Sequence, residues 1–316
     1  MNLACLFPGQ GTQKPGMLRE LGDALPLAED IFTAASDVTG RDVRQLCLNA
    51  SEAELRQTQN TQLAVTAMNL AFYAALTHAG VQPQVVMGHS LGQFSALYAA
   101  GVLSLEDTFR VVEKRAELMA ACGGGSALCT VLGLHPEQVD SICRSLDPSG
   151  ESITVALHNT ETQVVIGGTE AQIALAEPLC RQAGALRTIA VKVSHAFHTP
   201  LMRPMEEGFS GFVQDLELHE PKCRIILNCK GDFAENIEDI RQDMILQCCH
   251  TVHFYAGLKK LLALPELSLC EVGIGKTLAG MVRSTDPSKT TYLLSNPRQR
   301  MQCIARCQEG GTYGGI

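Results

Sequence analysis

Apolar residues open the chain as a short strand and then recur with a helical period. Residues 3–7 are apolar and lead into a glycine-containing turn at residues 8–11. Further along, apolar residues recur at spacings of three and four, which is typical of a helix with one buried face; they are Leu63, Ala67, Leu70, Ala71, Ala74 and Ala75. Strands and helices that alternate in this way predict an α/β fold.

A second apolar strand leads directly to a serine. Residues 85–87 are wholly apolar and end at Gly88, and residues 91–100 follow with a helical pattern that Gly101 closes. A strand without polar alternation is typical of a parallel sheet covered on both faces. We therefore predict that a buried parallel strand turns into a helix at Ser90.

The pattern changes after three consecutive glycines at residues 123–125. Shorter elements follow, in the order strand, helix, strand, strand, helix, strand; we predict them at residues 127–132, 136–146, 153–157, 163–166, 170–183 and 186–193. The order βαββαβ is that of a ferredoxin-like unit. It predicts a small domain over residues 126–193.

Long helical segments return after this unit, with further apolar strands at residues 224–227 and 267–272. The small domain is therefore predicted to be inserted into a core formed by residues 1–125 and 194–298. Residues 299–316 contain four late glycines and little to bury. We expect them to be a mobile tail.

Composition excludes several classes of function. The 316 residues are 46% hydrophobic, and 25 Lys and Arg against 33 Asp and Glu leave a net charge of -8 without a basic run, so we expect no nucleic-acid partner. No apolar stretch approaches a membrane span, and no basic leader precedes Pro8, so we expect a cytoplasmic protein without a membrane partner. The thirteen Cys include no CxxC pair, which favours reduced thiols.

The segment Gly88-His89-Ser90-Leu91-Gly92 fits the pattern G-x-S-x-G, in the strand-to-helix context that this pattern requires. Glycines on both sides permit a tight turn that exposes the serine hydroxyl at a helix N-terminus. We predict that Ser90 is a nucleophile.

A serine nucleophile needs a base, and three histidines are the main candidates. His198 and His195 follow the last strand of the predicted insert, at a domain boundary where a cleft is expected. His198 is better placed if the chain turns into a helix at Thr199. His89 is adjacent to Ser90, so its side chain should point away from the serine.

Two further groups complete the candidate site. An oxyanion hole needs two N–H donors. We expect one from Leu91, which follows the nucleophile, and one from Gln10 in the turn after the first strand. Arg115 lies on a helix 25 residues after Ser90. If that helix packs beside the nucleophile, its guanidinium offers a forked site for a carboxylate.

These residues together resemble the malonyl-CoA:acyl carrier protein transacylase family, which includes stand-alone acyltransferases of polyketide synthases. The resemblance covers roughly residues 1–295, through motifs at residues 7–11, 88–92 and 271–276 together with Arg115, His198 and Gln247. It implies an α/β-hydrolase-like core with an inserted ferredoxin-like domain. It also implies that His198 is the base, oriented by a backbone carbonyl that we expect near Gln247, which lies in the cleft.

The resemblance implies transfer of a malonyl-type unit from coenzyme A, through an acyl-enzyme on Ser90, to the phosphopantetheine thiol of an acyl carrier protein. Residues 195–198 read His-Ala-Phe-His, which in this family accompanies malonyl. Phe197 would fill the volume that a methylmalonyl group needs. We expect no cofactor, since coenzyme A enters as the substrate thioester, and we expect a monomer.

Two departures from the family leave alternatives open. Gln93 stands where the family usually has an acidic residue, and Ile274 where it usually has proline. A divergent member could move an extender unit between two carrier proteins, or hydrolyse carrier-bound acyl chains. Arg115 disfavours the hydrolase, which has no need of a carboxylate clamp. A docking module without turnover is the remaining alternative, and the intact serine, histidine and arginine disfavour it.

Overall fold

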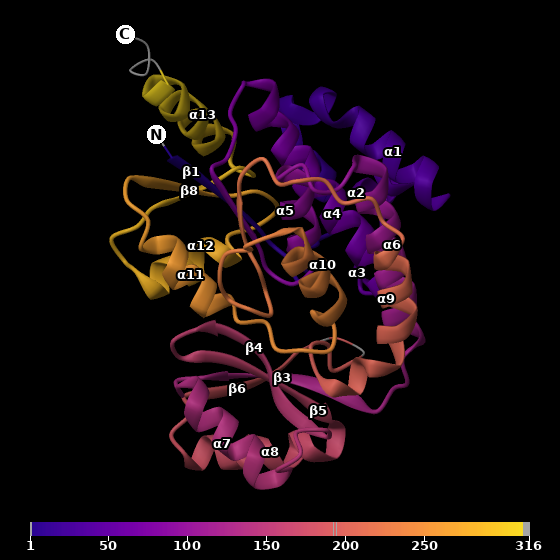
Figure 1. The fold of residues 1–316 in the computed structure, drawn as a ribbon, viewed down its shortest axis with the longest axis vertical. Helices are drawn as coiled ribbons and strands as arrows, with labels where there is room; N and C mark the ends of the chain where they lie inside the picture. The colour runs from indigo at the N-terminus through magenta and orange to yellow at the C-terminus, as the bar shows by residue number, and fades with distance from the viewer. Residues whose placement is uncertain (1, 192, 194, 312–316) are drawn as a thin grey trace.

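The computed structural model describes residues 2–191, 193 and 195–311, and it contains two separate sheets (Figure 1). The first is a parallel sheet in the order β7-β2-β1-β8-β9. Its strands are β1 (Asn2–Phe7), β2 (Val85–Gly88), β7 (Arg224–Ile226), β8 (Leu267–Glu271) and β9 (Thr291–Leu293). The central strands are buried along most of their length, which agrees with their unbroken apolar sequences.

Helices cover the parallel sheet and form most of the larger part of the molecule. They are η1 (Met17–Ala28), α1 (Glu29–Thr39), α2 (Val43–Asn49), α3 (Glu52–Leu55), α4 (Thr58–His78), α5 (Gly92–Ala99), α6 (Leu105–Ala121), η2 (Pro200–Met205), α9 (Glu206–Gln214), α10 (Ile237–Leu246), α11 (Phe254–Leu262), α12 (Thr277–Thr285) and α13 (Pro297–Gly311). None of the helices in the described part of the chain has both the length and the apolar character to cross a membrane.

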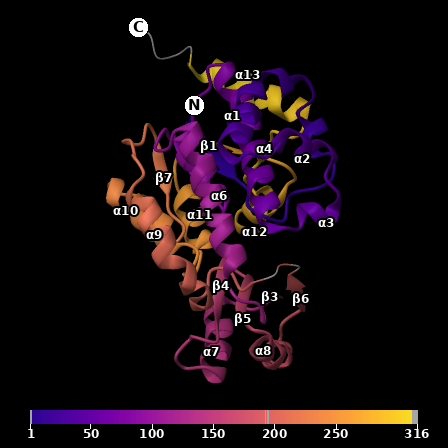
Figure 2. The same ribbon diagram turned by 90° about the vertical axis from the view of Figure 1, so that its right-hand side faces the viewer.

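The second sheet is antiparallel, in the order β4-β5-β3-β6, and carries its own small core. Its elements are β3 (Ser126–Leu132), α7 (Pro136–Leu146), β4 (Ile153–Thr160), β5 (Gln163–Thr169), α8 (Glu170–Gln182) and β6 (Arg187–Val191). Their order along the chain is the predicted one. Figures 1 and 2 show this part as a lobe beside the parallel sheet, with α7 and α8 on its far side.

Backbone hydrogen bonds join the small antiparallel sheet to a segment of the core. The N–H of Val252 donates to Ala156 O, and the N–H of His158 donates to Val252 O, each over 2.9 Å. The segment after α10 therefore continues along the edge of β4. This contact fixes one side of the small lobe against the core.

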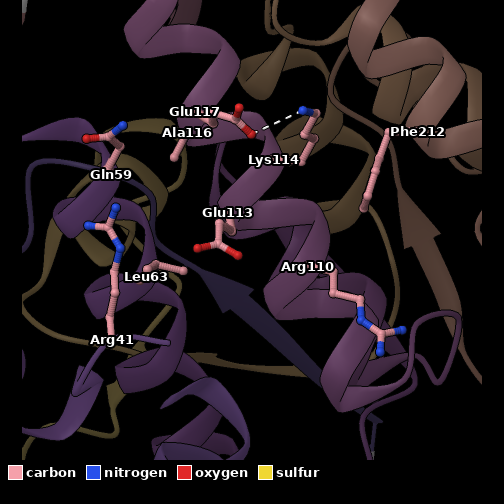
Figure 3. A pocket seen from close by; sticks show the side chains of 9 residues that line it. All are labelled: Arg41, Gln59, Leu63, Arg110, Glu113, Lys114, Ala116, Glu117 and Phe212. Atoms are coloured by element: carbon pink, nitrogen blue, oxygen red, sulfur yellow. Dashed lines mark hydrogen bonds and ion pairs between the residues drawn. The ribbon is translucent and has the colours of Figure 1, made fainter. Parts of the chain in front are cut away.

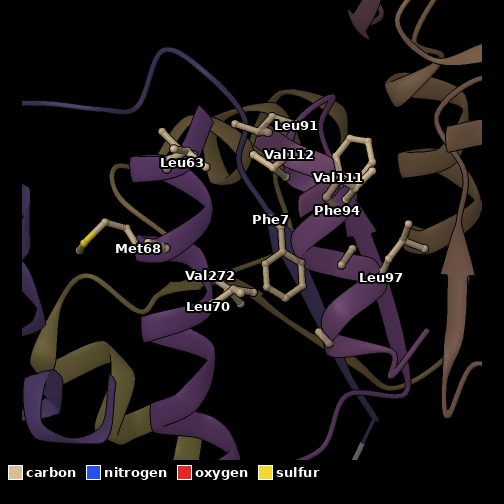
Figure 4. Packing of buried hydrophobic residues seen from close by; sticks show 14 of the residues in the cluster. Phe7, Leu63, Met68, Leu70, Leu91, Phe94, Leu97, Val111, Val112 and Val272 are labelled. Atoms are coloured by element: carbon tan, nitrogen blue, oxygen red, sulfur yellow. The ribbon is translucent and has the colours of Figure 1, made fainter. Parts of the chain in front are cut away.

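The main core lies between α4, α5, α6 and the parallel sheet (Figure 4). Phe7, Phe94 and Leu91 are fully buried there. Because the Leu91 side chain belongs to the core, only its backbone is available to the cleft. The core thus anchors the residue that follows Ser90.

The C-terminal segment differs from the expected tail. Helix α13 extends to Gly311, and Cys303 on it is fully buried in the main core. Arg300 is also buried and donates to Leu294 O over 2.9 Å. The late glycines suggested little burial, but a few apolar contacts anchor this helix. Residues 312–316 of the predicted tail lie outside the described residues.

Candidate active site

Ser90 occupies the tight turn between β2 and α5, as predicted. Its φ is 51°, a left-handed conformation that a non-glycine residue adopts only when its surroundings hold it there. A Cβ on Gly88 or on Gly92 would collide with neighbouring backbone. The two glycines of the motif are therefore required by the close packing of this turn.

His198 is the histidine that meets the serine. Its Nε2 lies 2.7 Å from Ser90 Oγ, and its Nδ1 lies 2.6 Å from the carbonyl oxygen of Gln247. A carbonyl only accepts, so Nδ1 carries the proton and Nε2 accepts from the Ser90 hydroxyl. The orienting carbonyl belongs to Gln247 itself, where we expected one nearby.

The other two candidate histidines make different contacts. His195 Nε2 lies 2.7 Å from Cys122 O, and His89 Nε2 lies 2.7 Å from Asn159 Oδ1. His89 therefore points toward β4, away from the serine. The structure selects His198 from the three.

The environment of His198 favours its neutral form. Burial and, to a smaller extent, the charge of Arg115 lower the pKa of His198 to about 3, while the hydrogen bond to Gln247 acts in the opposite direction. At neutral pH the imidazole is therefore uncharged, and its Nε2 is able to accept a proton.

Arg115 extends from α6 to the serine. Its Nη2 lies 3.3 Å from Ser90 Oγ and 3.4 Å from Gln247 Oε1, and its Nη1 donates to Gln62 Oε1 over 2.6 Å. The side chain is fully buried, and its Nε has no hydrogen-bond partner among the described residues. No carboxylate in the described part of the chain forms an ion pair with it. A buried cation of this kind is suited to bind an anion.

The turn after β1 packs directly on the serine turn. A Cβ placed on Gly9 would lie 2.5 Å from His89 O and 3.5 Å from the Leu91 nitrogen. Within the described residues, neither the N–H of Gln10 nor that of Leu91 has a hydrogen-bond acceptor. The turn after β1 and the serine turn thus each present one N–H group beside Ser90 that has no acceptor in the described part of the chain.

A cavity of about 310 Å³ extends outward from Gln10. Phe197 is buried and lines this cavity together with Val191 and Val193. Its ring centroid lies 5.9 Å from that of His195. Phe197 thus forms part of the wall of a cavity that also includes Gln10.

A second cavity, of about 340 Å³, lies on the outer side of α6 and does not include these residues (Figure 3). Arg41, Glu113 and Phe212 are among its lining residues, and Lys114 there pairs with Glu117. None of the predicted site residues lines it. It is separate from the candidate active site.

Sequence reasoning missed a network of amides behind the serine. Asn228 Oδ1 accepts from the Ser90 N–H over 2.8 Å, and Asn228 Nδ2 donates to Gly88 O and to Gln93 Oε1. Gln93 Nε2 in turn donates to Ile226 O. One signal was present: Asn228 comes directly after a predicted parallel strand, and such strand ends lie at the edge where ligands bind.

Comparisons with known proteins agree with this arrangement. The family described as acyl transferase domain matches residues 5–283. A malonyl CoA-acyl carrier protein transacylase of Bacillus subtilis is 32% identical over 297 residues, covering 93% of this chain and 94% of the relative. A Staphylococcus aureus protein of the same name is 34% identical, covering 89% of this chain and 91% of the relative.

Solved structures of similar proteins agree with these sequence comparisons. The malonyl CoA-acyl carrier protein transacylase from Coxiella burnetii superposes with a TM-score of 0.92 at 29% identity, covering 97% of this chain and 98% of that one. A malonyl-transacylase solved in complex with its type II polyketide synthase acyl carrier protein superposes with a TM-score of 0.91 at 29% identity. The match covers 97% of this chain and 100% of that one.

Proposed function

We propose that this chain, which belongs to the acyl transferase domain family, moves a malonyl unit from coenzyme A to an acyl carrier protein. The observation that carries this proposal is Arg115, a buried cation 3.3 Å from Ser90 Oγ with no carboxylate partner in the described residues. A malonyl group attached to Ser90 would bring the missing carboxylate to this guanidinium.

The reaction has two balanced steps. In the first, Ser90 Oγ attacks the thioester carbonyl while His198 Nε2 takes the hydroxyl proton; the carbon–sulfur bond breaks, and the coenzyme A thiolate leaves with the proton from His198. In the second, the phosphopantetheine thiol gives its proton to His198 and attacks the serine ester; a new thioester forms, and the bond between the acyl carbon and Ser90 Oγ breaks. The hydroxyl of Ser90 is then restored by the same proton.

The remaining site residues have positioning and stabilising roles in this proposal. The unused N–H groups of Gln10 and Leu91 stabilise the oxyanion of each tetrahedral intermediate, a role worth about 10²- to 10³-fold in rate per donor. Gln247 orients His198 through its carbonyl and lies beside Arg115 through its amide. Phe197 limits the space beside the acyl group. The reaction requires no cofactor, because serine and histidine supply its nucleophile and base.

The fold can be described more finely. We propose that residues 1–125 and 194–298 form an α/β-hydrolase-like core and residues 126–193 a ferredoxin-like insert. The turn at Ser90, between a parallel strand and a helix, supports the first assignment. The element order βαββαβ and the strand order β4-β5-β3-β6 support the second.

The experiment that tests the activity is intact-mass analysis of the protein with malonyl-CoA in the absence of carrier protein. We expect one malonyl increment on the wild type and none on Ser90→Ala. A carrier protein added afterwards should receive the malonyl group and restore the original mass. If the wild type gains no increment, coenzyme A is not the donor; if the increment is lost to water at the same rate with or without carrier protein, the protein is a hydrolase.

A further inference from the structure

Two side chains at the C-terminal end of α10 lie close to the active site. Asp243 and Gln247 are four residues apart, so they lie on the same side of the helix. Gln247 accepts from His198 through its carbonyl and donates from Nε2 to Ser90 O over 3.1 Å. Asp243 has no part in the reaction described above.

Asp243 is a buried carboxyl. It is 5% exposed, and its Oδ1 accepts from the N–H of Cys229 over 2.7 Å. Its Oδ2 is buried and has no hydrogen-bond partner among the described residues. A carboxyl with one oxygen unpaired is costly to bury and is found preferentially at functional sites.

The residue before Cys229 is Asn228, which holds the nucleophile. Asn228 accepts from the Ser90 N–H and donates to Gly88 O, each over 2.8 Å. It therefore connects the backbone on both sides of the left-handed serine. Contact between Asp243 and the Cys229 N–H fixes the backbone from which this side chain extends.

We propose that Asp243 is a positioning residue for acyl transfer, which fixes the backbone at Cys229 and, through Asn228, the strained backbone of Ser90. Asp243 and Gln247 thereby place nucleophile and base from one helical turn. This inference rests on the proposed function. It adds to the proposed site a residue, Asp243, that does not itself contact the reacting atoms.

The surroundings of Asp243 make its role dependent on pH. The groups that face it are the backbone N–H groups of Asn228 and Cys229 and the Cys229 thiol. The nearby cations have other partners, since Lys230 pairs with Glu235 and Asp239, and Arg241 donates to Val213 O. Burial raises the pKa of Asp243 to about 6. An ionised carboxylate accepts more strongly than a protonated one, so the positioning contact weakens as the pH falls through about 6.

Three variants test the inference. Asp243→Ala removes the acceptor, whereas Asp243→Asn keeps an oxygen for the Cys229 N–H and abolishes the titration. Gln242→Ala is the matched control, because Gln242 is the neighbouring residue on α10 and is exposed. The measurements are kcat and KM for transfer from malonyl-CoA to carrier protein, and the pH dependence of Ser90 acylation.

We expect Asp243→Ala to lose about 10- to 100-fold in kcat, with KM for malonyl-CoA changed by less than about twofold. Asp243→Asn should retain kcat within about threefold at neutral pH, and its pH profile of acylation should lack the inflection near pH 6 that we expect for the wild type. Because the pKa of His198 is about 3, the base does not titrate in that range. Gln242→Ala should match the wild type.

Two results would overturn the inference: wild-type kcat in Asp243→Ala, or an inflection near pH 6 that persists in Asp243→Asn. The second measurement decides the question even if Asp243→Ala does not fold. A wild-type protein that takes no malonyl group at all would instead count against the proposed function. The two failures are therefore distinguishable.

Discussion

Ser90 and His198 both have a left-handed backbone conformation, with φ of 51° and 65°, and Ser90 Oγ lies 2.7 Å from His198 Nε2. Each such conformation costs about 1–3 kcal/mol and needs external support. The Ser90 N–H is held by Asn228, and the His198 N–H donates to Cys248 O over 2.8 Å. The pair is thus aligned by its neighbours before any substrate binds.

Replacing Arg115 by Ala should reduce malonyl loading far more than acetyl loading. A charge-assisted hydrogen bond contributes about 1.5–3 kcal/mol, so we expect a selective loss of roughly 10- to 150-fold. Rates of Ser90 acylation by malonyl-CoA and acetyl-CoA measure it. Arg115→Met serves as a folding control, because it removes a buried unpaired charge and should not destabilise the fold. Equal losses for both acyl groups would refute the carboxylate clamp.

The charge of Arg115 should also be visible in the acid limb of the acylation profile. His198 accepts a proton only when neutral, and its pKa of about 3 keeps it neutral down to strongly acidic pH. Removal of the nearby positive charge in Arg115→Met should raise this pKa, so the acid limb moves to higher pH. The comparison is best made in the Asp243→Asn background, which lacks the second titration. An unshifted limb would mean that Arg115 does not act on the base.

Replacing Gln93 by Glu should destabilise the protein at pH 8. The Gln93 amide donates to Ile226 O and accepts from the Gly88 N–H, and an ionised carboxylate cannot donate. We expect a loss of roughly 2–4 kcal/mol in the free energy of unfolding. Burial should raise the pKa of the new carboxyl, so stability returns as the pH falls through that raised value. Urea unfolding at pH 8 and pH 6 tests this, with exposed Gln82→Glu as control.

Replacing Phe197 by Ser should relax the preference for malonyl over methylmalonyl. One methyl group in a pocket is worth about 1–3 kcal/mol, so the ratio of kcat/KM for the two donors should change by roughly 5- to 150-fold. Phe197→Leu removes less volume, so its ratio of kcat/KM for the two donors should lie between those of the wild type and Phe197→Ser. A ratio that stays constant across the three proteins would exclude Phe197 from the acyl pocket.

Replacing Gly92 by Ala should disrupt the serine turn. The added Cβ would collide with the carbonyl groups of Phe7 and Pro8, which cannot yield as a flexible side chain can. We expect a loss of acylation together with a lower melting temperature. Gly280→Ala is the matched control in helix α12, where an added Cβ meets nothing within 4 Å, and it should stabilise by about 0.5–1 kcal/mol. Full activity in Gly92→Ala would contradict the packing described here.

The sequence predicted the strands of both sheets except β9, because their patterns are strong; β9 has only three residues and is half-buried, so it leaves no such pattern. Residues 85–87 are wholly apolar, and the glycines around Ser90 admit few other conformations. Helix α13 was missed, since only a few of its residues are buried and late glycines obscured them. Element boundaries also moved: β4 extends to Thr160, beyond the predicted end at residue 157, because a register shift between Val155 and Leu157 lets the pairing continue.

The candidate site could be predicted where a short motif fixes the geometry, as at Ser90 and Leu91, whereas His198 was one of three candidate histidines until the family resemblance favoured it. Gln62, Asn228 and Asp243 could not be found in this way. Their contacts span 53, 138 and 14 residues along the chain, and single amides or carboxylates carry no local signature. Only the fold brings them together.

The unpaired guanidinium of Arg115 has a consequence for the whole catalytic cycle. Its desolvation is a cost that the free protein bears at all times, and the proposed malonyl-enzyme would recover part of it through an internal ion pair. Acylation would therefore act as a stabilising ligand does, by raising the population of the native state. The proposed cycle would therefore give the free protein a lower free energy of unfolding than the malonyl-enzyme.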